Sequence, residues 1–145
     1  MKLKKFENLF LELINNKKNP FHPLVWINGK PKIGKKTYIG GFSEINAKDA
    51  KVTIGNNCDI ASFVSINVAD THKRCIGMKK NKSVKDIIIG NNVFVGTHSA
   101  ILGGAIIGNN TVVAAGTIVR EGVIPPYSLV IGNPPVVKKS YYKKK

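Results

Sequence analysis

Few side chains in this chain of 145 residues could do acid–base, nucleophilic or metal chemistry. The histidines and cysteines are His22, His72, His98, Cys58 and Cys75. The cysteines match no metal-ligand spacing and are too few for a disulfide framework, which favours a reducing, cytoplasmic compartment. His72 stands out because it lies in NVADTHKRC (67–75), a stretch that interrupts an otherwise regular sequence. Since histidine can accept a proton near neutral pH, this interruption is the first candidate site.

A six-residue period surrounds the interruption. The string IGNN occurs at 54–57, 89–92 and 107–110, and the last two copies are 18 residues apart. Steps of six fall on Ile or Val at thirteen of fourteen positions, far more often than the composition alone would give. These positions are Ile33, Ile39, Ile45, Ile54, Ile60, Ile66, Ile89, Val95, Ile101, Ile107, Val113, Val119, Pro125 and Ile131.

Neither a helix nor an ordinary strand repeats every six residues, but a coil of three short strands joined by tight corners does. Each Ile or Val then points to the axis, and the Gly and Asn that follow tolerate the positive φ of a tight corner. The sequence therefore predicts an all-β solenoid over residues 33–137. The irregular stretch 72–88 predicts one loop extruded from the rigid coils, where binding and catalytic residues are commonly carried.

Both ends of the chain differ from the repeat. Residues 1–32 are expected to cap the solenoid, and residues 138–145 to form a basic tail. Apolar residues within the cap recur at three- and four-residue steps and predict a short amphipathic helix, lying on the body of the protein or on a sister subunit, with a membrane surface as the second option. They are Leu3, Phe6, Leu9, Phe10, Leu13 and Ile14. The run is too short and too charged for a signal peptide or a membrane span.

Three segments resemble a known family: VTIGNNCDIASFVSI (52–66), IIIGNNVFVGTHSAILGGAIIG (87–108) and AAGTIVREGVIPPYSLVIGNPP (114–135). They are similar to the hexapeptide-repeat acyltransferases, and within these to the sugar O-acetyltransferases typified by galactoside and maltose acetyltransferases. The resemblance implies a left-handed parallel β-helix and transfer of an acetyl group from acetyl-CoA to a sugar hydroxyl. It also implies homotrimers with active sites between neighbouring prisms. No metal is expected, because the cysteines match no metal-ligand spacing.

The resemblance gives roles to individual residues. His72 occupies the position of the catalytic base. Independently of the resemblance, Asp70, two residues before it, is a candidate to orient its ring. Asp49 matches an aspartate that positions the acceptor, and Glu44 belongs to a corner that contacts the acceptor. Phe94 stands where relatives often have an acceptor-side tryptophan.

Cofactor contacts are implied in the same way. Gly96, Thr97 and Ala115 fall where backbone groups meet the pantetheine arm of CoA. Arg120 and Lys139 fall near its other end, where phosphates need cations.

The chemistry suits these residues. A thioester is already a good acyl donor, whereas a sugar hydroxyl is a poor nucleophile, so the missing ingredient is a base. His72 would accept the hydroxyl proton and return it to the departing CoA sulfur, for a contribution of roughly 10² to 10⁴ in rate. A backbone N–H near Gly96 or Thr97 could stabilise the oxyanion.

Three other interpretations account for parts of the sequence. Transfer to an amine of a nucleotide-linked amino sugar keeps the chemistry and changes the acceptor. Zinc-dependent carbonic anhydrases share this prism but need three converging histidines, and beyond His72 and His98 the chain has no third histidine at a usable place. The net charge of +15 suggests polyanionic partners. A nucleic-acid-binding or purely structural β-helix is disfavoured, however, because the aromatic residues are not interleaved with cations along the coils.

Overall fold

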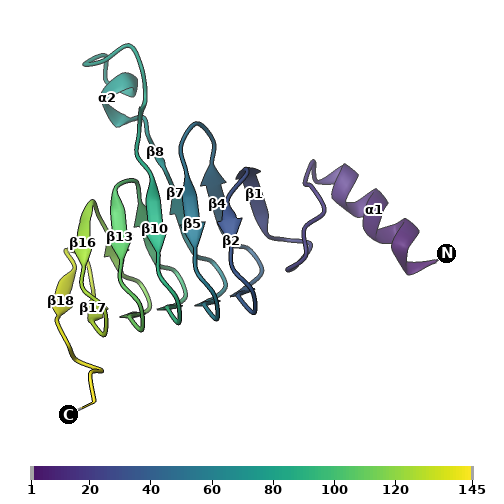
Figure 1. Ribbon diagram of the computed structural model, residues 1–145. Coiled ribbons are helices and arrows are strands. Elements are labelled where there is room, and N and C mark those ends of the chain that lie inside the picture. Colours follow the sequence, from purple (N-terminus) through teal and green to yellow (C-terminus); the bar gives the residue numbers. More distant parts are fainter. Residues whose placement is uncertain (1, 145) are drawn as a thin grey trace.

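The computed structural model describes residues 2–144 as a three-sided prism wound from short parallel strands, with a helix at one end and a loop rising from one edge (Figure 1). It is a parallel β-solenoid, consistent with the left-handed β-helix that the family resemblance implies. We call the three sheets sides A, B and C, in the order in which the chain visits them. Side A contains β1 (Trp26–Gly29), β4 (Glu44–Ala47), β7 (Ser65–Asn67), β12 (Ala100–Leu102) and β15 (Ile118–Val119). Side B contains β2 (Lys32–Ile33), β5 (Val52–Ile54), β10 (Ile87–Ile89), β13 (Ala105–Ile107) and β16 (Gly122–Ile124). Side C contains β3 (Tyr38–Ile39), β6 (Asp59–Ile60), β11 (Phe94–Val95), β14 (Val112–Val113), β17 (Leu129–Ile131) and β18 (Val136–Lys138).

The core is a set of stacked Ile and Val columns, one inside each side. On side A, Ile45 pairs with Ile66, Ile66 with Ile101, and Ile101 with Val119. All four are at most 1% exposed, as the six-residue period predicts. Burying such side chains contributes roughly 1.5–3 kcal/mol each, which makes the columns the main source of stability.

The period slips by one residue in the last coil. Ile107 pairs with Ile124, and Val113 pairs with Val130. Ile124 and Val130 are therefore buried, while Ile131 is 38% exposed. The expectation that Pro125 and Ile131 point to the axis was wrong, because this coil is one residue shorter than the coil before it.

The IGNN string builds the edge between sides B and C. The first Asn of each copy accepts a backbone N–H from the preceding coil: Asn91 Oδ1 lies 2.8 Å from Asn56 N, and Asn109 Oδ1 lies 2.8 Å from Asn91 N. The Gly must lack a side chain, because a Cβ on Gly90 would lie 2.4 Å from Asn109 Oδ1. The second Asn takes the positive φ of the corner, as at Asn92 (φ 55°).

The extruded loop leaves the edge between sides A and B. Its stem is an antiparallel pair of β8 (Ala69–Asp70) and β9 (Ser83–Val84), and α2 (His72–Cys75) forms one turn beyond it. The sequence placed this loop at 72–88, but the coil resumes at Ile87, which is fully buried at the start of β10. The stem was missed because its two strands are too short to show a period of their own.

The N-terminal helix α1 (Leu3–Leu13) projects from the end of the prism (Figure 1). Leu11 is its buried residue, whereas Leu3, Phe6, Leu9 and Leu13 are more than half exposed. The body of the same chain therefore does not cover this apolar face, and the sister-subunit and membrane alternatives stay predictions. The solenoid also begins earlier than residue 33, because β1 pairs in parallel with β4. No helix within residues 2–144 has the length and apolar content needed to cross a membrane.

Candidate active site

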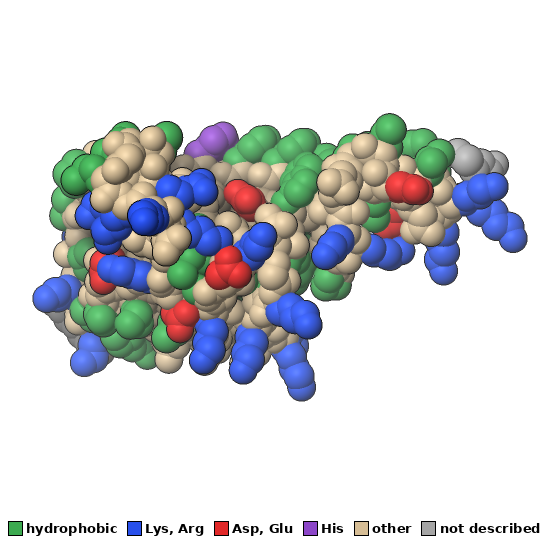
Figure 2. Space-filling model, turned by 90° about the horizontal axis from the view of Figure 1, so that it is seen from above, with side chains coloured by type: hydrophobic (Ala, Val, Ile, Leu, Met, Phe, Trp, Pro, Cys, Tyr) green, Lys and Arg blue, Asp and Glu red, His purple; other side chains and the backbone are tan. Residues whose placement is uncertain are grey.

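A cleft of about 540 Å³ lies at the foot of the extruded loop, on the edge between sides A and B. The loop and the last residues before it line one wall, and the next two coils line the other. The first wall consists of Val68, Ala69, Asp70, His72, Lys73, Lys79, Ser83 and Lys85. The second consists of Leu102, Gly103, Arg120 and Glu121. Figure 2 looks down on this region and shows the Lys and Arg side chains gathered around the loop.

His72 is held in the cleft by Asp70. Both residues lie where the chain turns from β8 into α2, so one carboxylate reaches two groups of the same residue. Asp70 Oδ1 accepts the backbone N–H of His72 at 3.0 Å and lies 2.5 Å from its ring Nδ1. With Nδ1 as the donor, Nε2 remains free to accept a proton.

The charge of Asp70 is maintained by the same contacts. The backbone N–H of His72, followed by its ring, lowers the pKa of the Asp70 carboxyl below its ordinary value. Asp70 is therefore ionised at neutral pH and favours the imidazole with a proton on Nδ1. The sequence offered Asp70 as a candidate to orient the ring of His72, and the structure shows the two side chains in contact.

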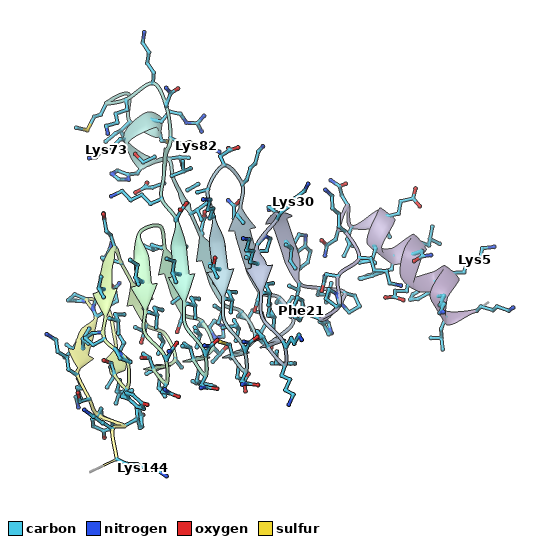
Figure 3. The ribbon with its side chains drawn as sticks, viewed as in Figure 1. Lys5, Phe21, Lys30, Lys73, Lys82 and Lys144 are labelled. Atoms are coloured by element: carbon cyan, nitrogen blue, oxygen red, sulfur yellow. The ribbon has the colours of Figure 1, made fainter. Side chains whose placement is uncertain are left out.

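Two ion pairs tie the loop to the coils. Lys85, at the base of the loop, pairs with Glu121 on the corner after β15. Lys82 pairs with Asp49, on the corner after β4, at 2.6 Å. Figure 3 shows Lys73 and Lys82 on opposite flanks of the loop. The hydrogen bond and charge of Lys82 lower the pKa of Asp49. The sequence gave no signal for either tie, since their partners lie 36 and 33 residues apart.

The residues expected to meet the pantetheine arm form a group of their own on another edge. Gly96, Thr97 and Ala115 lie on the edge between sides C and A. A Cβ on Gly96 would lie 2.4 Å from the backbone nitrogen of Ala115, so the two corners are in direct contact. Side A separates this group from His72 within one chain.

The remaining predicted site residues are distributed over the prism. Arg120, expected near the phosphates of CoA, lines the His72 cleft. Glu44 begins β4 on side A, and Phe94 lies on side C with 40% exposure. Lys139 follows β18 at the far end. Of the predicted set, the cleft lining includes His72 and Arg120.

One aromatic cluster was not foreseen. Phe42, Phe63 and His98 stack along the edge between sides C and A, with ring centroids 5.0 Å apart at both steps. All three have positive φ at equivalent corners of successive coils. His98 therefore belongs to this stack and not to the cleft. Within residues 2–144, no three His, Cys, Asp or Glu side chains are grouped so that they could hold a metal ion.

Comparison with known proteins agrees with this architecture. The family "Bacterial transferase hexapeptide (six repeats)" matches residues 86–121. The bifunctional protein GlmU of Wigglesworthia glossinidia brevipalpis is 34% identical over 108 residues, covering 70% of this chain and 23% of that protein. The galactoside O-acetyltransferase of Escherichia coli K12 is 38% identical over 104 residues, covering 70% of this chain and 50% of that protein.

Solved structures give the same result. The crystal structure of NeuO, a polySia-specific acetyltransferase, superimposes with a TM-score of 0.65 at 30% identity, covering 79% of this chain and 60% of that one. The chain spans half or less of the length of the two curated relatives above. Its repeats, its parallel β-solenoid and these relatives together establish that the chain belongs to the hexapeptide-repeat transferase family.

Proposed function

We propose that this chain is an acetyl-CoA-dependent O-acetyltransferase that acts on a sugar hydroxyl, with His72 as the general base. The observation that carries the proposal is the Asp70–His72 pair in the cleft, 2.5 Å apart, with the second ring nitrogen free. A carboxylate that fixes the tautomer of a histidine is the arrangement that general-base catalysis requires.

The proton transfers follow from this geometry. Nε2 of His72 takes the hydroxyl proton as the sugar oxygen forms a bond to the thioester carbonyl carbon. The carbon–sulfur bond then breaks, and the proton passes from Nε2 to the leaving sulfur, giving CoA thiol and an acetyl ester. Asp70 accepts the Nδ1 proton in a hydrogen bond throughout and stabilises the imidazolium formed in between. No covalent intermediate on the protein is required.

The separation of the two edges supports a homotrimer. Gly96, Thr97 and Ala115, which we assign to the pantetheine arm, lie across side A from His72 in the same chain. A second copy can present its own pantetheine edge to the first copy's loop. In this arrangement Asp49, Glu44 and Phe94 would contact the acceptor, and Lys139 the CoA phosphates.

The relatives support a sugar acceptor, since the Escherichia coli relative is a galactoside O-acetyltransferase and NeuO is specific for polySia. Acetylation of an amine is the alternative. AntD of Bacillus cereus, an N-acyltransferase crystallised with dTDP and coenzyme A, shares the fold with a TM-score of 0.71 at 20% identity. The same fold therefore accommodates both acceptor types.

Thiol release from acetyl-CoA, measured with a panel of sugars, amino sugars and nucleotide-linked sugars, tests the proposal. We expect turnover with a hydroxyl acceptor, and in His72→Gln a loss of kcat of about 10²-fold or more with CoA affinity kept. Turnover with amines alone would show that the chain is an N-acetyltransferase and not an O-acetyltransferase. Unchanged turnover in His72→Gln would show that His72 is not the general base.

A further inference from the structure

The charges that line the His72 cleft are unbalanced. Its two carboxylates are already engaged, Asp70 by His72 and Glu121 by Lys85. Three of its four cations, Lys73, Lys79 and Arg120, form no ion pair with any residue from 2 to 144. The cleft is therefore positive where an acceptor must approach the base.

The unpaired cations come from both walls. Lys73 follows His72 directly in α2, and Lys79 lies further along the loop. Arg120 faces them from the coil wall, on the corner after β15, where its guanidinium donates to the side-chain oxygen of Asn133 at 3.5 Å. Because like charges repel, such a cleft favours an occupant that carries negative charge. An arginine also presents paired donors that match a carboxylate or a phosphate.

From this arrangement we infer that the acceptor is an anionic sugar, one with a carboxylate or phosphate near the hydroxyl that is acetylated. The inference rests on the proposed transferase function and names its substrate class. It moves Arg120 from the CoA phosphates to the acceptor. The pantetheine arm keeps the phosphates of CoA well away from the thioester, whereas Arg120 lines the same cleft as the base. Negative charge at this point must therefore come mainly from the acceptor.

Matched acceptors test the charge preference. Glucose is compared with glucuronate for a carboxylate, and with a nucleoside-diphosphate glucose for a phosphate. We expect the charged member of one pair to have a kcat/KM at least about tenfold higher, and this advantage to shrink as salt is added. Equal rates for neutral and charged acceptors would overturn the inference and leave the transferase function in place.

Substitutions of single cations then identify the residues that bind the anionic acceptor. In Arg120→Gln and Lys79→Gln we expect the KM for the anionic acceptor to rise about tenfold, with the KM values for the neutral acceptor and for acetyl-CoA unchanged. Lys30→Gln, which removes an exposed cation from the corner after β1 (Figure 3), outside the residues that line the cleft, is the matched control and should change nothing. A rise in the KM for acetyl-CoA instead would assign these cations to the cofactor. That outcome is checked with acetyl-pantetheine as the acetyl donor. Because it has no phosphates, its KM should then be unchanged by the substitutions.

If no acceptor is turned over, binding measurements still test the inference. The imidazole signals of His72 are followed by NMR as glucuronate, and separately the nucleoside-diphosphate sugar, is added to the wild-type protein. Shifts that saturate, and that need about tenfold more ligand in Arg120→Gln, support an anion site beside the base whatever the reaction. Absence of saturable shifts with both ligands would overturn it.

Discussion

The carboxylate of Asp70 and the ring of His72 form a pair in which one oxygen, Oδ1, accepts both the backbone N–H and the ring Nδ1–H of the same residue. Asp70, two residues away, thus holds His72 at two points, its backbone N–H and its ring. This contact is local, so it survives any movement of the loop as a whole. It specifies which nitrogen faces the cleft.

The first prediction concerns the tautomer. In Asp70→Asn the amide oxygen can still accept both N–H groups but is neutral and stabilises the imidazolium less, and in the flipped rotamer the amide group donates to Nδ1 and favours a proton on Nε2. We expect kcat to fall about 10²-fold with little change in the KM of either substrate. Asp59→Asn, an exposed carboxyl on side C, is the control. Steady-state kinetics that leave kcat intact would show that Asp70 does not set the tautomer.

The second prediction is a pH dependence of stability. Lys82 lowers the pKa of Asp49 in the folded protein. The stabilisation from this pair is therefore fully present above the unfolded pKa of about 3.9, and is lost as the pH falls through the lower folded value. Urea unfolding should give a difference between wild type and Asp49→Asn that is constant from about pH 7 to about pH 5, begins to shrink near pH 4 and is lost as the pH falls further through the lowered pKa of Asp49. A difference that grows as the pH falls would contradict the pairing.

The third prediction concerns the core. Ile101 is fully buried between Ile66 and Val119 in the side A column. Ile101→Ala should lower the free energy of unfolding by about 2–5 kcal/mol, because the rigid coils cannot collapse into the cavity. Ile88→Ala removes a side chain that is 45% exposed on side B and should cost about 0.5 kcal/mol or less. Equal losses in denaturant titrations would mean that the columns are not the main source of stability.

The repeat made most of this fold predictable, because its period states both where a side chain points and which residue it meets one coil later. The one-residue slip in the last coil could not be predicted from the sequence, for a physical reason. Ile124 and Pro125, and likewise Val130 and Ile131, offer apolar residues in both phases, so composition does not choose between them. Only the strand register does.

The site was less predictable than the coils. His72 and its neighbour Asp70 could be found because their contact is local. The ties from Lys82 and Lys85 join residues more than thirty positions apart, and no period marks them. The position of Arg120 in the His72 cleft could have been found by counting, since it follows a side A strand just as the loop does.

The last prediction tests whether the site needs two copies. His72 and Ala115 lie on different edges of one prism, so a shared site takes the base from one protomer and the pantetheine edge from its neighbour. His72→Ala and Ala115→Trp, the latter adding bulk at an exposed corner, should each be inactive alone.

Mixed after dissociation and reassembly, the two variants can form an interface in which both contributing surfaces are intact. Random assembly of a three-fold ring gives such an interface at about one quarter of the sites. Thiol release should therefore recover to about a quarter of the wild-type rate in the mixture. The same amounts mixed without dissociation should remain inactive. A site built within one chain cannot recover at all, because each copy would keep its own defect.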